Sequence, residues 1–214
     1  MKAKYGGRKV VCGIDRLERL KGVPVKMVAI ERFFQSHPEW IDKVVFIEIG
    51  VTASERGLDY MQTKELVRRI VNRINARYSG EHQAVVFQEK SEQEITLPNR
   101  LSLFAASDLL LTVAPRDGLN RTPIEYTLAH NGDGREPGMM VLSEFVSAAR
   151  VMRGAIKLNP WRIDDVVEAV QSALEAGHEE RAKRHAKCVE FAARQTTAAW
   201  AFQVLLDLKR VNKE

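Results

Sequence analysis

The sequence is poor in cysteine, and the residues that could bind a metal are scattered. Cys12 and Cys188 are the two cysteines of the 214-residue chain, and they lie far apart in sequence. Cys12 falls in the apolar run VVCGI, where a buried and reduced thiol is expected. The five histidines do not cluster at ligand spacing either. We therefore expect no metal site, no cofactor and a reducing, cytoplasmic environment.

Long apolar runs and dense basic stretches are also missing. No stretch approaches the ~20 apolar residues of a membrane-spanning helix, and the N-terminus MKAKYGGRKV has no apolar core of a secretory signal. We therefore expect a soluble protein with no membrane partner. The net charge of +5 is small and spread along the chain, and no Lys/Arg run interleaves with aromatic residues, so nucleic acid is not expected as a partner. A site for phosphate-bearing small molecules would explain part of the excess equally well.

Six short, nearly continuous apolar runs predict strands that are covered on both faces, as in a parallel sheet. They are residues 9–14, 43–51, 84–89, 108–114, 138–144 and 154–159. Helical patterns alternate with them. The first, within residues 21–40, places Val25, Val28, Ala29, Arg32 and Phe33 near helical spacing. This alternation predicts an α/β fold, a Rossmann-like doubly wound parallel sheet formed by residues 1–195, and a terminal helix within 196–214.

The loop after the first predicted strand, GIDRLERLKGVP, contains cations that could bind an anion. It has no G-x-G-x-x-G, so a dinucleotide fingerprint is absent. Ligands of doubly wound sheets bind at the carboxyl ends of the strands. Arg16 and Lys21 could therefore both bind one diphosphate there. The alternative is a surface loop in which these cations pair with Asp15 and Glu18.

The break PRDGLN after the fourth predicted strand is typical of an anion site at the start of a helix. Gly118 permits a positive φ and close approach of a ligand. The backbone N–H groups of Leu119, Asn120 and Arg121 would point at the anion, aided by the helix dipole.

Two carboxylates flank these amide groups. Asp117 is suited to accept hydrogen bonds from sugar hydroxyls. Glu125 has two interpretations: it could bind a ligand, or it could complete a structural capping box in Thr122-Pro123-Ile124-Glu125.

Several segments stand in the order and spacing of one known family, the trehalose-6-phosphate synthases. They are GIDRLERLKGVP, RDGLN…EY, LSEFVSAA and GAIKLNPW, with further similarity in HPEWIDKVVFIEI and TTAAW. From about Gly7 to about Leu208, the chain resembles the C-terminal, donor-binding half of these GT-B glycosyltransferases. The resemblance implies retaining transfer of glucose from UDP-glucose to glucose 6-phosphate, which gives trehalose 6-phosphate and UDP. The N-terminal half, which holds most of the acceptor site, would be a missing partner, so the chain alone is expected to be inactive.

The resemblance also implies roles for individual residues. The donor diphosphate would be clamped by Arg16 and Lys21, and the glucose hydroxyls would donate to Asp117. The remaining donor contacts would come from the backbone N–H groups of Gly118, Leu119, Asn120 and Arg121, from Glu125 at the ribose hydroxyls, and from the main chain near Glu94 and Ile95 at the uracil.

Two departures from the family pattern bear on the donor. Glu18-Arg19 stands where the family has an Asp-Tyr pair, and Arg121 stands where it has an aliphatic residue. Both put the nucleotide preference in question. Two alternatives stay open: a non-catalytic regulatory relative, and a related transferase with another acceptor such as glycerol 3-phosphate.

The terminal helix carries Trp200, Val204, Leu205 and Leu208 on one stripe. In GT-B enzymes the terminal helix commonly crosses to the other half. We therefore expect part of this apolar face to be exposed, or to pack against a second copy of the chain in a homo-oligomer.

Overall fold

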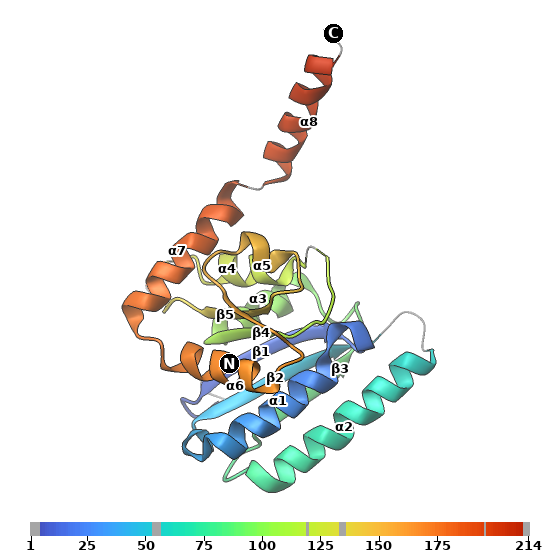
Figure 1. The fold of residues 1–214 in the computed structure, drawn as a ribbon, viewed down its shortest axis with the longest axis vertical. Helices are drawn as coiled ribbons and strands as arrows, with labels where there is room; N and C mark the ends of the chain where they lie inside the picture. Colours follow the sequence, from blue (N-terminus) through green and yellow to red (C-terminus); the bar gives the residue numbers. More distant parts are fainter. Residues whose placement is uncertain (1–4, 53–56, 119, 133–135, 195, 212–214) are drawn as a thin grey trace.

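The computed structural model describes residues 5–52, 57–118, 120–132, 136–194 and 196–211 (Figure 1). Its centre is a six-stranded sheet in which all neighbouring strands are parallel, in the order β3-β2-β1-β4-β5-β6. The strands are β1 (Lys9–Arg16), β2 (Val44–Val51), β3 (Val85–Lys90), β4 (Leu109–Thr112), β5 (Met139–Ser143) and β6 (Ile156–Leu158). All six strands expected from the apolar runs are confirmed, and so is the doubly wound parallel topology.

Helices cover both faces of the sheet, which explains why the strands are continuously apolar (Figure 1). One face packs against α1 (Val23–Ser36), α2 (Leu58–Tyr78) and α6 (Ile163–Glu175). The other packs against α3 (Leu97–Ala106), α4 (Thr122–Ala129), α5 (Ala148–Val151) and α7 (His178–Arg194). All eight residues of β2 are buried as a result.

The first helix buries a stripe that differs in part from the one expected. Helix α1 starts at Val23, with Pro24 in its first turn, where a proline loses no helical hydrogen bond. The expected stripe is wrong in part, because Val28 and Arg32 are exposed. The buried side chains are instead those of Val23, Lys26, Met27, Ala29, Ile30, Phe33 and Phe34.

The terminal helix α8 (Thr197–Val211) has no buried residue and extends away from the body of the molecule (Figure 1). Trp200 and Leu205 are about two-thirds exposed, and Leu208 is more than half exposed. The expected exposure of this apolar face is confirmed within the chain. None of the helices in the described ranges is long and apolar enough to cross a membrane.

Candidate functional site

A cavity of about 510 Å³ opens at the carboxyl ends of β1 and β4, where the order of the strands reverses along the chain. It brings together six of the residues predicted from the sequence: Arg16, Lys21, Ile95, Asp117, Asn120 and Arg121. They come from three separate segments, at and after the end of β1, after β3 and after β4, so only the fold makes them neighbours. The rest of the lining is Ile14, Asp15, Val51, Glu92, Arg100 and Thr122.

Gly22 determines how the first of these segments approaches the others. It has a φ of 69°, in the left-handed region, and forms the N-cap of α1. A Cβ atom there would lie 2.5 Å from the carbonyl oxygen of Val113 and 2.8 Å from Pro115 Cδ. The absence of a side chain therefore lets the loop from β1 pack on the segment after β4. Lys21 Nζ then lies 2.8 Å from Asp117 Oδ1.

Arg16, at the end of β1, also lines the cavity and is paired with a carboxylate that the sequence did not indicate. Its Nη2 donates to Glu92 Oε1 at 2.7 Å, and both side chains are more than half exposed. Pairing with Asp15 or Glu18, the alternative considered from the sequence, does not occur. An exposed ion pair of this kind contributes only about 0–1 kcal/mol, so an incoming diphosphate could replace Glu92 at little cost.

Asp117 is held firmly by its neighbours. Its Oδ1 accepts from Lys21 Nζ and from the N–H of Gly118 at 2.9 Å, and its Oδ2 faces Asn120 Nδ2 at 3.3 Å. A parallel bridge also joins Asp117 to Val146, after β5. Among the described residues, the Oδ2 atom makes only this longer contact, so it is the atom best placed to accept from a further ligand.

The start of α4 is less open than the sequence suggested. The N–H of Asn120 donates to the Gly118 carbonyl at 3.0 Å, so it is already used, as is that of Gly118. The N–H of Arg121 has no partner among the described residues. Gly118 does not have a positive φ, but a Cβ there would meet no heavy atom within 4 Å, so space for a ligand remains. Leu119 lies outside the described residues.

Glu125 does not form a capping box. The N-cap of α4 is Arg121, and no side chain caps the helix, so the capping-box interpretation is wrong. The Glu125 carboxylate instead accepts two hydrogen bonds from Arg100 of α3, at 2.7 and 2.9 Å. The same guanidinium donates to the Ile95 carbonyl at 2.9 Å. Hydrogen bonding to Glu125 raises the pKa of Arg100.

Below the cavity, three charged side chains form a buried cluster. Lys26 Nζ of α1 lies 2.6 Å from Asp15 Oδ2 and 2.8 Å from Glu48 Oε2, and all three residues are at most 4% exposed. Burial raises the pKa of Glu48 to about 7, with Asp15 raising and Lys26 lowering it. Glu48 Oε1 has no hydrogen-bond partner among the described residues. The cluster fixes Asp15, and with it the end of β1 that carries Arg16.

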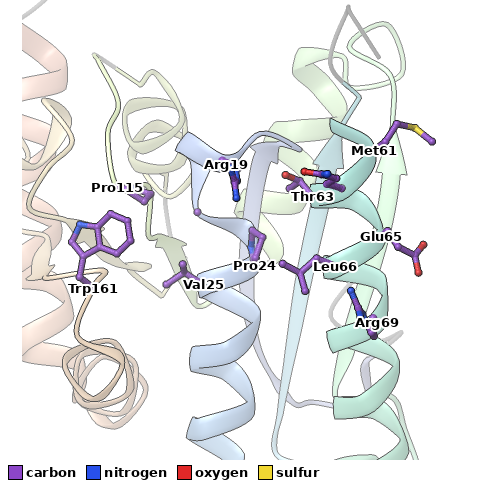
Figure 2. A pocket seen from close by; sticks show the side chains of 12 residues that line it. Arg19, Pro24, Val25, Met61, Thr63, Glu65, Leu66, Arg69, Pro115 and Trp161 are labelled. Carbon is purple, nitrogen blue, oxygen red and sulfur yellow. The ribbon is translucent and has the colours of Figure 1, made fainter. Parts of the chain in front are cut away.

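A second cavity, of about 790 Å³, lies on the other side of the β1 loop (Figure 2). Figure 2 places Trp161 and Pro115 on one side and Met61 and Leu66 of α2 on the other. Its lining is mainly apolar, and none of the residues predicted to bind the donor contributes to it. Where the chain is described, no three His, Cys, Asp or Glu side chains lie close enough to hold a metal ion.

Similarity to known proteins identifies the family of this chain. The model of glycosyltransferase family 20 matches residues 1–210, nearly the whole chain. The chain belongs to this family. It is 34% identical over 212 residues to the 56 kDa subunit of the UDP-forming alpha,alpha-trehalose-phosphate synthase of Kluyveromyces lactis, covering 99% of this chain and 42% of the relative. This family 20 chain therefore spans less than half the length of that relative.

Two solved structures share the fold. The UDP-forming alpha,alpha-trehalose-phosphate synthase of Burkholderia xenovorans in complex with glucose-6-phosphate superposes with a TM-score of 0.90 at 28% identity, over 98% of this chain and 46% of that one. The Escherichia coli protein bound with UDP-2-fluoro glucose gives 0.90 at 26% identity, over 97% and 45%. The six-stranded sheet of this family 20 chain is thus one part of a GT-B architecture.

The site of this family 20 chain contains residues that sequence reasoning missed. Arg100 lies in the first turns of α3, and its partner Glu125 is 25 positions away, so no local spacing could reveal the pair. Lys26 sits among apolar residues of α1, and the expected stripe of that helix did not include it. Glu48 was the better signal, because a carboxylate inside the run VVFIEIGV requires a buried partner.

Proposed function

We propose that this chain forms the donor-binding part of a UDP-forming trehalose-phosphate synthase, which transfers glucose from UDP-glucose to glucose 6-phosphate. The observation that carries the proposal is the joint presence of Arg16, Lys21 and Asp117 around one cavity at the carboxyl edge of the sheet. The names of the curated relative and of the two structural neighbours support this choice of donor and acceptor.

In the proposed reaction, the bond between the glucose C1 and the diphosphate oxygen breaks, and a bond from C1 to an acceptor hydroxyl oxygen forms. The acceptor hydroxyl gives its proton to the departing diphosphate oxygen, and UDP leaves with the bonding electron pair. Arg16 and Lys21 stabilise the negative charge that develops on the leaving diphosphate. Asp117 accepts from the glucose hydroxyls and positions C1. We assign no protein nucleophile, and in the proposed reaction the α-configuration at the glucose C1 is retained.

The acceptor site belongs in this proposal to the remaining length of the relatives, which the chain does not span. Helix α8, within residues 196–214, would cross to that part and bury its apolar face there. The chain alone would bind the donor nucleotide but transfer little or no glucose. A cytoplasmic location is also part of the proposal, since both cysteines are free and buried.

Calorimetric titration of the chain with UDP, UDP-glucose, ATP and NAD tests the proposal. We expect binding of UDP and UDP-glucose in preference to ATP and NAD. Arg16→Met and Lys21→Met should each weaken UDP binding about tenfold or more, because each removes one charge-assisted contact to the diphosphate.

Lys43→Met is the matched control, because Lys43 is an exposed cation that precedes the amino end of β2, at the opposite edge of the sheet. It should leave UDP affinity unchanged. Binding of NAD with no binding of UDP would exclude the proposed function.

A further inference from the structure

The Arg100 side chain makes three hydrogen bonds in the part of the site that is proposed to hold the nucleoside. Its Nε and Nη2 atoms donate to the two oxygens of Glu125, and its Nη1 donates to the main-chain carbonyl of Ile95. The Arg100 side chain is 23% exposed and that of Glu125 is 18% exposed. Arg100 also lines both the 510 Å³ cavity and a neighbouring one of about 310 Å³, which meet at Ile95.

We propose that Arg100 is a positioning residue for the nucleoside. One guanidinium joins the carboxylate proposed to bind the ribose hydroxyls to the carbonyl proposed to meet the base. Arg100 therefore determines how well the site distinguishes a ribonucleotide from an analogue without ribose hydroxyls. This inference rests on the proposed function, because it takes UDP as the ligand.

The contacts leave room for the ligand at both acceptors. An ionised carboxylate has about four lone-pair sites, and a carbonyl oxygen has two. Arg100 uses one site on each Glu125 oxygen and one on the Ile95 carbonyl. Glu125 can thus receive ribose hydroxyls while the planar fork of Arg100 holds its orientation.

Charge gives a second reason for the arrangement. Glu125 lies one helical turn into α4, at the end of the helix where the diphosphate is proposed to bind. An unpaired carboxylate there would repel the diphosphate across a partly buried site. Arg100 balances that charge and frees Arg16 and Lys21 to act on the phosphates.

The test measures the Kd of the chain for UDP, 2′,3′-dideoxy-UDP and inorganic pyrophosphate by calorimetry. In the unmodified chain, we expect UDP to bind about tenfold or more tightly than its dideoxy analogue. Arg100→Met should weaken UDP binding about tenfold and reduce the UDP preference to less than about threefold. Pyrophosphate binding should weaken by less than about threefold in Arg100→Met, because Glu125 loses its balancing charge while Arg16 and Lys21 remain, and should not change in Arg100→Lys, which keeps the cation.

Arg100→Lys separates orientation from charge, because lysine keeps the cation but lacks the fork. It should lose the ribose preference as Arg100→Met does. It also carries the test if the methionine variant does not fold by circular dichroism. Arg73→Met is the matched control: Arg73 makes a two-point ion pair with Glu31, between α2 and α1, and its loss should leave all three Kd values unchanged.

The outcomes distinguish this inference from the proposed function. If the Arg100 variants keep the full preference for UDP over the dideoxy analogue, Arg100 does not position Glu125. If Arg100→Met binds UDP more tightly than the unmodified chain, Arg100 competes with the nucleoside and the inference is overturned. If the unmodified chain binds pyrophosphate but not UDP, the proposed function fails whatever Arg100 does.

Discussion

At the residue scale, the site depends on a few residues that fix the backbone around it. Gly22 allows two loops to touch, and the Asp15–Lys26–Glu48 cluster holds the end of β1. Neither feature binds a ligand directly. Each acts on the site by fixing the backbone that carries Arg16 and Lys21, so each should be visible first in stability.

Gly22→Ala should lower the free energy of unfolding by about 2 kcal/mol or more, because alanine is strained at positive φ and its Cβ would meet the Val113 carbonyl. Urea denaturation measures this change. Gly177→Ala is the control, since a Cβ at Gly177 meets no heavy atom within 4 Å, and it should stay within about 0.5 kcal/mol. Equal effects of the two substitutions would contradict the assigned role of Gly22.

Ionisation of Glu48 should lower the free energy of unfolding as the pH rises. Burial raises its pKa to about 7 in the folded chain, whereas an unfolded glutamate ionises near ~4.3. Between these values the folded state binds more protons than the unfolded state, so the free energy of unfolding decreases with pH. Glu48→Gln cannot ionise and should remove this part of the slope.

Urea denaturation at pH 5, 6, 7 and 8 measures that slope, with about 0.1 M salt throughout. Glu168→Gln, at an exposed position of α6, is the control and should keep the slope of the unmodified chain. A slope that is the same with and without Glu48 would show that its pKa is not raised.

At the scale of the elements, strands were predictable and helix faces less so. The β2 run VVFIEIGV could hardly be anything but a strand buried on both faces, and it is one. In α1, however, the apolar residues Val23, Val25 and Val28 compete for the buried stripe. Tertiary packing buries Val23, and with it Met27 and Ile30, rather than Val25 and Val28, which periodicity alone could not determine.

The candidate site divides in the same way. Arg16, Lys21 and Asp117 could be predicted because each follows a strand, and a parallel sheet collects such loops at one edge. Glu92, which pairs with Arg16, and Arg100, which pairs with Glu125, could not be predicted. Their contacts join loops and helices that are remote in sequence. Predicted free amides at Gly118 and Asn120 proved to be used within the loop itself.

Helix α8 should contribute nothing to the thermal stability of the rest of the domain. Deletion of residues 197–214 should therefore leave the thermal unfolding midpoint within about 2 °C, because no side chain of α8 is buried. Differential scanning calorimetry measures the midpoint. A fall of more than about 5 °C would show that α8 packs on the domain in solution. By contrast, deletion of residues 178–214, which also removes α7, should lower the unfolding midpoint strongly, since α7 buries Arg181, Cys188 and Ala192.

At the scale of the whole molecule, the strand order places the site. Because the chain leaves β1 in one direction to β2 and later returns to β4 on its other side, the loops after β1 and β4 diverge and leave a cavity between them. The sequence pattern predicted the class of fold, but the sheet order follows from right-handed crossovers acting over the full chain. In the proposed function, the nucleotide site would therefore lie within this Rossmann-like domain.

The carboxylates that already accompany Arg16, Lys21 and Arg100 have a kinetic consequence. Each of these three cations is paired with a carboxylate at the cavity, so little electric field extends from the pairs into solvent. A nucleotide would reach the cavity by ordinary diffusion with little long-range attraction, and its association rate would change little with ionic strength. Selectivity among phosphorylated metabolites would then arise after encounter, from how long each one remains.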